Sequence, residues 1–89
     1  MLQLVRKSRF KKDFKKLLSS GKDLGKLASV IRALQAQEAL PERNRDHALT
    51  GNYIGHRECH VSPDWLLVYQ TTETELILVR TGSHSELFG

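Results

Sequence analysis

The chain has 89 residues, a length that supports one hydrophobic core, so we expect one domain over residues 1–89. Hydrophobic residues make up 39% and charged residues 27% of the chain, a balance that favours a packed fold over disorder. The single cysteine excludes an internal disulfide, and no apolar run reaches the roughly 20 residues of a membrane span, so we expect a cytoplasmic protein that does not enter a membrane.

The net charge of +4 is unevenly distributed along the chain. Residues 1–45 carry 12 basic and 4 acidic side chains, a net +8, whereas residues 46–89 carry 2 basic and 6 acidic ones, a net −4. The first half should therefore attract nucleic acid or an acidic protein over long range. All four histidines lie in the second half, so attraction and acid–base chemistry are separated along the sequence.

The first half predicts a short strand at residues 2–5 and two helices. Ser8 is expected to cap a helix with an amphipathic pattern, its apolar face made by Phe10, Phe14, Leu17 and Leu18. Lysines, among them Lys15 and Lys16, cover the rest of this helix, and Gly21 ends it. Asp23 is expected to cap a second helix that continues to Leu40 and is stopped by Pro41.

The second half predicts strands instead of helices. Gly51 and Gly55 mark a turn or bulge, and strands are expected at residues 57–61, 66–71 and 75–81, with Pro63 and Asp64 turning the chain between the first two. The fold class is therefore α+β, with two helices packed on one face of a small antiparallel meander. The opposite face is expected to be free to hold a site.

Side chains on a strand alternate between faces, which separates possible catalytic residues from the core. His56, Glu58 and His60 point one way, whereas Cys59 and Val61 point toward the core. Arg80 has the parity of the apolar residues of its strand, and packing alone explains it poorly. Each polar residue also has an ordinary interpretation: solvated histidines, an aspartate turn, a core tryptophan, and an arginine that pairs with Glu58 or Glu75.

Taken together, these residue types suit metal-free RNA cleavage. A base removes the proton of a ribose 2′-OH, an acid protonates the leaving 5′-oxygen, and an arginine stabilises the phosphorane. Trp65 or Phe88 would stack an unpaired base. The set His47, His60, Asp64 and His84 also offers zinc ligands, but it lacks the paired spacing of a dedicated site. A serine or cysteine nucleophile is a weaker alternative.

Two segments resemble a known family. The stretches "DHALTGNYIGHRECHVSPDWLLVY" and "VRTGSHSELFG" are similar to the YafQ branch of the RelE-like toxins of bacterial toxin–antitoxin systems. The resemblance covers the whole chain in length and element order, and its specific motifs lie in the second half. It implies a RelE-like microbial RNase fold and a ribosome-dependent mRNA interferase that needs no cofactor and leaves a 2′,3′-cyclic phosphate.

The resemblance also implies residue roles and partners. His84 is implied as the general acid, Arg80 as the phosphate stabiliser, and His60 with Asp64 or His47 as the base side. Trp65 and Phe88 are implied as supporting residues, and we expect Lys15 and Lys16 to bind RNA. The implied partners are the ribosome, mRNA and an acidic antitoxin that covers the site, with operator DNA bound only through the antitoxin complex.

Two departures limit what is carried over. His56 stands where relatives more often have an aromatic residue, and the RelE branch proper uses lysine, arginine and tyrosine where this chain has histidines. A non-catalytic binding module with the same fold, and a ribonuclease that acts without the ribosome, remain as alternatives.

Overall fold

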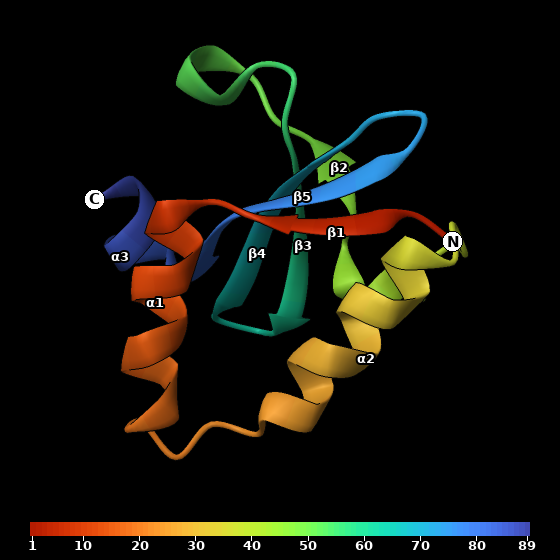
Figure 1. The fold of residues 1–89 in the computed structure, drawn as a ribbon. Coiled ribbons are helices and arrows are strands. Elements are labelled where there is room, and N and C mark those ends of the chain that lie inside the picture. Colours follow the sequence, from red (N-terminus) through yellow and green to blue (C-terminus); the bar gives the residue numbers. More distant parts are fainter.

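Five strands form one sheet, and two helices cover one of its faces (Figure 1). These elements come from a computed structural model that describes residues 1–89. In chain order they are β1 (Gln3–Arg6), α1 (Ser8–Leu18), α2 (Leu24–Gln35), a 3-10 helix (Glu42–Asn44), β2 (His47–Ala48), a second 3-10 helix (Gly51–Tyr53), β3 (Arg57–Ser62), β4 (Trp65–Thr71), β5 (Glu75–Gly82) and α3 (His84–Phe88).

The strand order across the sheet is β1-β5-β4-β3-β2. Strands β3, β4 and β5 form the predicted antiparallel meander, and β2 adds to it antiparallel at one edge. The opening strand instead pairs parallel with β5, because α1 and α2 carry the chain across one face before it returns as the meander. Residues 65–69 of β4 are all buried, as expected for a strand covered on both sides.

The helix ends differ in part from the prediction. Asp23 caps α2 as expected, with its carboxylate accepting from the Gly25 amide at 2.9 Å. Ser8 is the first residue of α1 and not its cap, since that position is Lys7, which makes no side-chain capping bond. Helix α2 ends at Gln35, well before Leu40, because Gln37 takes a left-handed φ of 58° and closes the helix with a Schellman-type turn.

The apolar side chains divide into two clusters, one on each face of the sheet. The larger lies under α1 and α2 and joins their buried residues to those of the strands, among them Phe10, Leu27, Cys59, Leu67 and Leu78. The smaller, Leu66, Val68 and Leu87, lies on the opposite face and is flanked by Leu49, Tyr53 and Val79.

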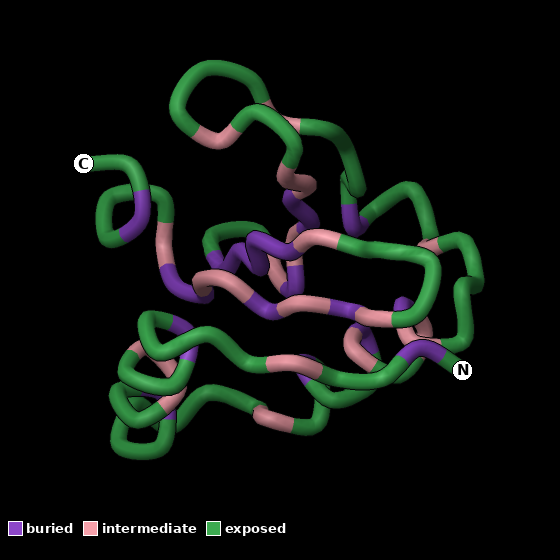
Figure 2. The backbone as a smooth tube through the Cα atoms, turned by 45° about the horizontal axis from the view of Figure 1, so that its top comes forward, coloured by how far each residue is buried: buried purple, intermediate pink, exposed green.

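The sequence predicted that the second face is free, and this is wrong. That face is partly covered by α3 and by the loop at residues 49–55. Leu49 and Tyr53 of this loop pack against the smaller cluster, but its other residues are exposed. Buried residues concentrate in the strands (Figure 2). None of the helices is long and apolar enough to cross a membrane.

Candidate active site

Side chains from four strands line up on the face opposite α1 and α2. His47 pairs with Glu58, Glu58 with Val68, and Val68 with Arg80, and residues paired directly across strands point to the same face. Val68 belongs to the smaller apolar cluster, so this row lies on the α3 side. His60, paired with Leu66 of the same cluster, adds a second row.

A β-bulge turns Arg80 onto this face. The register between β4 and β5 shifts between Val68 and Tyr69, so that Val68 pairs with Arg80 but Tyr69 with Leu78. The extra residue on β5 reverses the alternation of side chains beyond it. The parity expected from the sequence, which grouped Arg80 with Leu76 and Leu78, is therefore wrong beyond the bulge.

Arg80 is held by Asp13 of α1 and not by Glu58 or Glu75. Its Nε donates to Asp13 Oδ2 at 2.7 Å and its Nη2 to Oδ1 at 3.1 Å, and both side chains are only 11% exposed. Asp13 also accepts from the Thr81 amide at 3.1 Å, which fixes the carboxylate. The Asp13 carboxylate, with a smaller contribution from Tyr53, raises the pKa of Arg80, so the guanidinium stays cationic.

His84 reaches the site from the first position of α3. Ser83 and Glu86 form a reciprocal capping box that fixes the start of this short helix. The hydrogen bonds from Ser83 lower the pKa of Glu86, and Lys16 of α1 adds to the same effect. Asp64, in the turn between β3 and β4, lies 3.5 Å from His84 Nδ1 and accepts from the His84 amide at 3.3 Å.

His60 faces His84 across the site. The two ring centroids are 5.9 Å apart. The Nδ1 atom of His60 lies 3.2 Å from the Pro63 carbonyl oxygen, which leaves Nε2 without a protein partner. The buried Asn44 side chain donates to the His60 carbonyl at 2.6 Å and holds the end of β3 in place.

Both ring nitrogens of His47 face acceptors. Nδ1 lies 2.6 Å from the Arg45 carbonyl and Nε2 lies 3.2 Å from Glu58 Oε2. Glu58 is buried, with 4% of the residue exposed, and its other oxygen, Oε1, has no hydrogen-bond partner. Next to His47, Asp46 binds Arg57 at 3.2 Å and the Tyr69 hydroxyl at 2.5 Å, which anchors this edge of the sheet.

Trp65 belongs to the core, and its predicted role in stacking a base needs correction. The residue is 2% exposed, and its Nε1 donates to Thr81 Oγ1 at 2.9 Å. The ammonium of Lys22 lies 5.6 Å from the ring centroid. An indole fixed in this way has no face open to RNA. Cys59 is likewise buried, and burial raises its pKa to about 12, so it carries no thiolate nucleophile at neutral pH.

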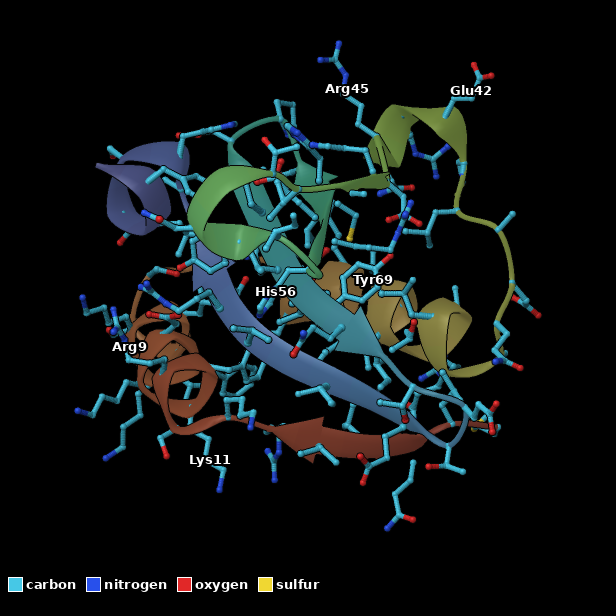
Figure 3. All side chains as sticks on the ribbon, turned by 90° about the horizontal axis from the view of Figure 1, so that it is seen from above. Arg9, Lys11, Glu42, Arg45, His56 and Tyr69 are labelled. Atoms are coloured by element: carbon cyan, nitrogen blue, oxygen red, sulfur yellow. The ribbon has the colours of Figure 1, made fainter.

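An aromatic row borders the histidines on the α3 side. Phe88 is 44% exposed, its centroid 6.1 Å from that of His84 and 5.6 Å from that of Tyr53. His56 packs edge-on against Tyr53 at 5.5 Å, on the loop that lies over the sheet in Figure 3. Phe88 thus keeps an exposed surface beside His84, as its predicted stacking role requires.

The basic side chains of α1 are not part of the site, in contrast to Arg80 of β5. Lys15 and Lys16 are exposed near the end of α1, and Arg9 and Lys11 of the same helix point away from the sheet in Figure 3. The alternative of a zinc site at His47, His60, Asp64 and His84 finds no three-ligand group, since no three histidine, cysteine, aspartate or glutamate side chains are placed to hold a metal ion.

Three residues of the site are not marked as such by the sequence pattern. Asp13 has the pattern of helix surface, Glu58 that of a possible partner of Arg80, and Tyr53 has no predicted role. Tyr53 is the one with a local signal, an aromatic residue between two turn glycines. Asp13 and Arg80 are 67 positions apart in the sequence, and no local sequence pattern indicates that they form an ion pair.

Comparisons with known proteins agree over almost the full chain. A family model described as "Bacterial toxin of type II toxin-antitoxin system, YafQ" matches residues 2–89. The mRNA interferase toxin YafQ of Escherichia coli (strain K12) is 40% identical over 81 residues, which are 90% of this chain and 88% of that protein.

Two solved structures have the same fold. A copper-bound mutant toxin from Helicobacter pylori superposes with a TM-score of 0.94 at 51% identity, covering 99% of this chain and 100% of that one. A chain of the DinJ–YafQ complex of Escherichia coli gives a TM-score of 0.91 at 36% identity, covering 100% of both chains.

Proposed function

This chain belongs to the YafQ family of toxins of bacterial type II toxin–antitoxin systems, and from that premise we propose that it is an mRNA interferase that cuts messages in the ribosomal decoding site. The observation that carries the proposal is the convergence of His60, His84 and Arg80 on one sheet face. Two imidazoles and a guanidinium supply the base, the acid and the phosphate stabiliser of a 2′-OH transesterification.

The hydrogen bonds of the histidines support one assignment of the base. A carbonyl oxygen only accepts, so the Nδ1 atom of His60 carries the hydrogen toward Pro63 and Nε2 keeps a lone pair for the 2′-OH proton. Each ring nitrogen of His47 faces an acceptor, so neither nitrogen is free to take that proton. We therefore assign His60 as the base.

His84 and Arg80 complete the reaction. The Asp64 carboxylate lies 3.5 Å from Nδ1 and orients the ring, so that a proton on Nε2 can pass to the leaving 5′-oxygen. Asp64 acts with the acid in this assignment and not with the base. Asp13 holds Arg80 through Nε and one Nη2 hydrogen, which leaves the other guanidinium donors for the phosphate oxygens. The proposed steps use only these imidazole and guanidinium groups.

The ribosome and an antitoxin complete the proposed system. The site is carried by one small sheet, so ribosomal RNA would hold the message in line for attack. The DinJ–YafQ complex shows that a relative assembles with an antitoxin, and an acidic antitoxin would complement the net +8 of residues 1–45. Such a toxin acts in the cytoplasm and contacts operator DNA only through its antitoxin.

A reconstituted cleavage assay tests the proposal. Purified protein is added to ribosomes that carry a defined message in the decoding site, and the new 5′ ends are mapped by primer extension. We expect a cut in the decoding site and a 2′,3′-cyclic phosphate on the upstream fragment. Equal rates on naked RNA would contradict ribosome dependence. Ribosome binding without any cut would support the non-catalytic alternative.

Chelation tests the metal-free chemistry separately. We expect the rate on programmed ribosomes to be the same whether the toxin was purified with or without a transition-metal chelator, because protonated and neutral imidazoles carry both proton transfers. Magnesium is held constant to keep the ribosome intact. Loss of cleavage on chelation, restored by zinc or copper, would show that a metal ion takes part.

The lysines of α1 should affect binding and not chemistry. Replacing Lys15 and Lys16 by glutamine is expected to weaken ribosome binding and to lower the dependence of log K on log salt by about 1 for each phosphate that is no longer neutralised. Arg32→Gln, on the exposed face of α2, serves as a control for charge alone. A reduced single-turnover rate at saturating ribosome would instead place the lysines in the chemical step.

A further inference from the structure

A pocket beside the histidines contains a buried carboxylate that the reaction does not use. The cavity measures about 550 Å³ and lies between the loop at residues 49–55 and α3. Its apolar walls are Leu49, Tyr53, Leu87 and Phe88. His84 lies on its border, and Glu58 is its one carboxylate. A volume of this size is in the range of pockets that bind small molecules.

Glu58 lines this pocket and has one unpaired oxygen. Oε2 is paired with His47 at 3.2 Å, but Oε1 is fully buried and has no hydrogen-bond partner. A buried carboxylate oxygen without a donor costs free energy, and natural proteins rarely keep one without a purpose. The carboxylate accepts and does not donate, so the missing partner must be an N–H or O–H group.

The aromatic lining of the pocket indicates which kind of ligand would supply the N–H or O–H donor for Glu58 Oε1. Tyr53 and Phe88 meet edge to face with centroids 5.6 Å apart, an aromatic surface of the kind on which single-stranded bases stack. Carboxylates in nucleic-acid complexes accept from the amino groups of bases. Uracil has no amino group and presents carbonyl oxygens, which a carboxylate repels.

We propose that this pocket receives one base of the message next to the cleaved phosphate, and that Glu58 Oε1 accepts a hydrogen bond from the exocyclic amino group of that base. The inference rests on the proposed function, since His84 at the border places the pocket beside the reacting phosphate. The pocket then selects adenine, cytosine or guanine over uracil.

The loop at residues 50–55 is the wall that moves to admit a base. Most of its residues are exposed, and Ile54 at its tip is 76% exposed and has no apolar cover. Gly51 and Gly55, with φ of 66° and 87°, bound the segment that carries Tyr53 and allow backbone angles that other residues resist. The Gly55 carbonyl is held only by a 3.4 Å contact with Gln70 Nε2. Lifting this loop separates Tyr53 from Phe88 and opens the pocket beside Glu58.

Base analogues test the proposal through a ratio of rates. Messages differ only in the nucleotide on either side of the cut: adenosine or purine riboside, guanosine or inosine, cytidine or pyrimidin-2-one riboside, and uridine. Each analogue lacks the exocyclic amino group of its partner. The pocket holds the nucleotide on one side of the cut. When that nucleotide is varied, the wild type is expected to cleave the message with the amino group about 10- to 100-fold faster than the analogue without it, the rate ratio that corresponds to one hydrogen bond to a charged group.

The variant Glu58→Gln assigns this preference to one residue. Its amide oxygen accepts from His47 and turns the NH₂ group into the pocket, so the amino preference should be lost or reversed in favour of carbonyl-bearing bases. Any slowing from the altered His47 contact acts on both messages and cancels in the ratio. Glu73→Gln, on an exposed turn, should keep the wild-type ratio.

The outcomes separate this inference from the proposed function. Cleavage by the wild type without discrimination at either position would overturn the pocket while supporting the interferase. If the ratio of the two cleavage rates is the same in Glu58→Gln as in the wild type, Glu58 does not recognise the amino group. Absence of cleavage of every message would overturn the proposed function, and this inference with it.

Discussion

Replacing His84 by alanine is expected to lower the single-turnover rate of cleavage by about 10²-fold or more, the scale for losing a general acid. The fold should be unchanged, because the His84 side chain is 57% exposed and the capping box of α3 is built from Ser83 and Glu86. Thermal melting should therefore match that of the unmodified protein. Wild-type cleavage by this variant would remove His84 from the mechanism.

A sulfur leaving group distinguishes an acid from a residue that only positions RNA. A message with a 5′-thio linkage at the cut site loses a thiolate, which needs no proton, so His84→Ala should recover most of its rate on that substrate. His60→Ala should stay slow on both substrates, since removal of the 2′-OH proton is still needed. His56→Ala is the control variant, because His56 packs on Tyr53 and is not one of the two histidines, His60 and His84, assigned to proton transfer.

Replacing Arg80 by alanine is expected to reduce cleavage by about 10²- to 10³-fold, because the charge that develops on the phosphorane loses its main stabiliser. The loss should fall on kcat more than on ribosome binding, since the charge grows in the transition state. Arg80→Lys should recover only part of the rate, because an ammonium cannot hold Asp13 and phosphate together in a fixed plane.

The stability of this variant must be measured together with its activity. Removing Arg80 leaves the Asp13 carboxylate, 11% exposed, without its cation, which costs about 3 kcal/mol of unfolding free energy. Urea denaturation should show this loss, and adding Asp13→Asn to Arg80→Ala should restore part of it without restoring cleavage. Cleavage that returns with stability would make Arg80 a structural residue.

Much of the fold follows from local patterns. The apolar spacing placed both helices, and Phe10, Leu17, Leu27 and Leu34 are buried as that spacing predicts. The strands of the meander begin and end within two residues of the expected positions. The end of α2 was missed because Gln37, in place of a glycine, takes the left-handed turn. Helix α3 was missed although "SHSE" contains the capping-box pattern.

The motifs identified most of the candidate site but not the contacts among its members. His60 and Asp64 both lie beside His84, and Phe88 borders the His84 ring. The motifs also contained Trp65, whose ring is in the core and supports the site from beneath through Thr81. A motif marks which residues matter, but it does not state whether a side chain contacts RNA or the protein interior.

The sequence by itself determined the element types, the cationic first half and the residue types available for acid–base chemistry, because propensity, periodicity and charge are properties of neighbouring residues. Only the tertiary structure decided that β1 lies parallel to β5, that a bulge turns Arg80 onto the site face, and that Glu58 is buried with a free oxygen. These features depend on strand register and on pairs such as Asp13 and Arg80, and a shift of one residue in register reverses which face a side chain takes.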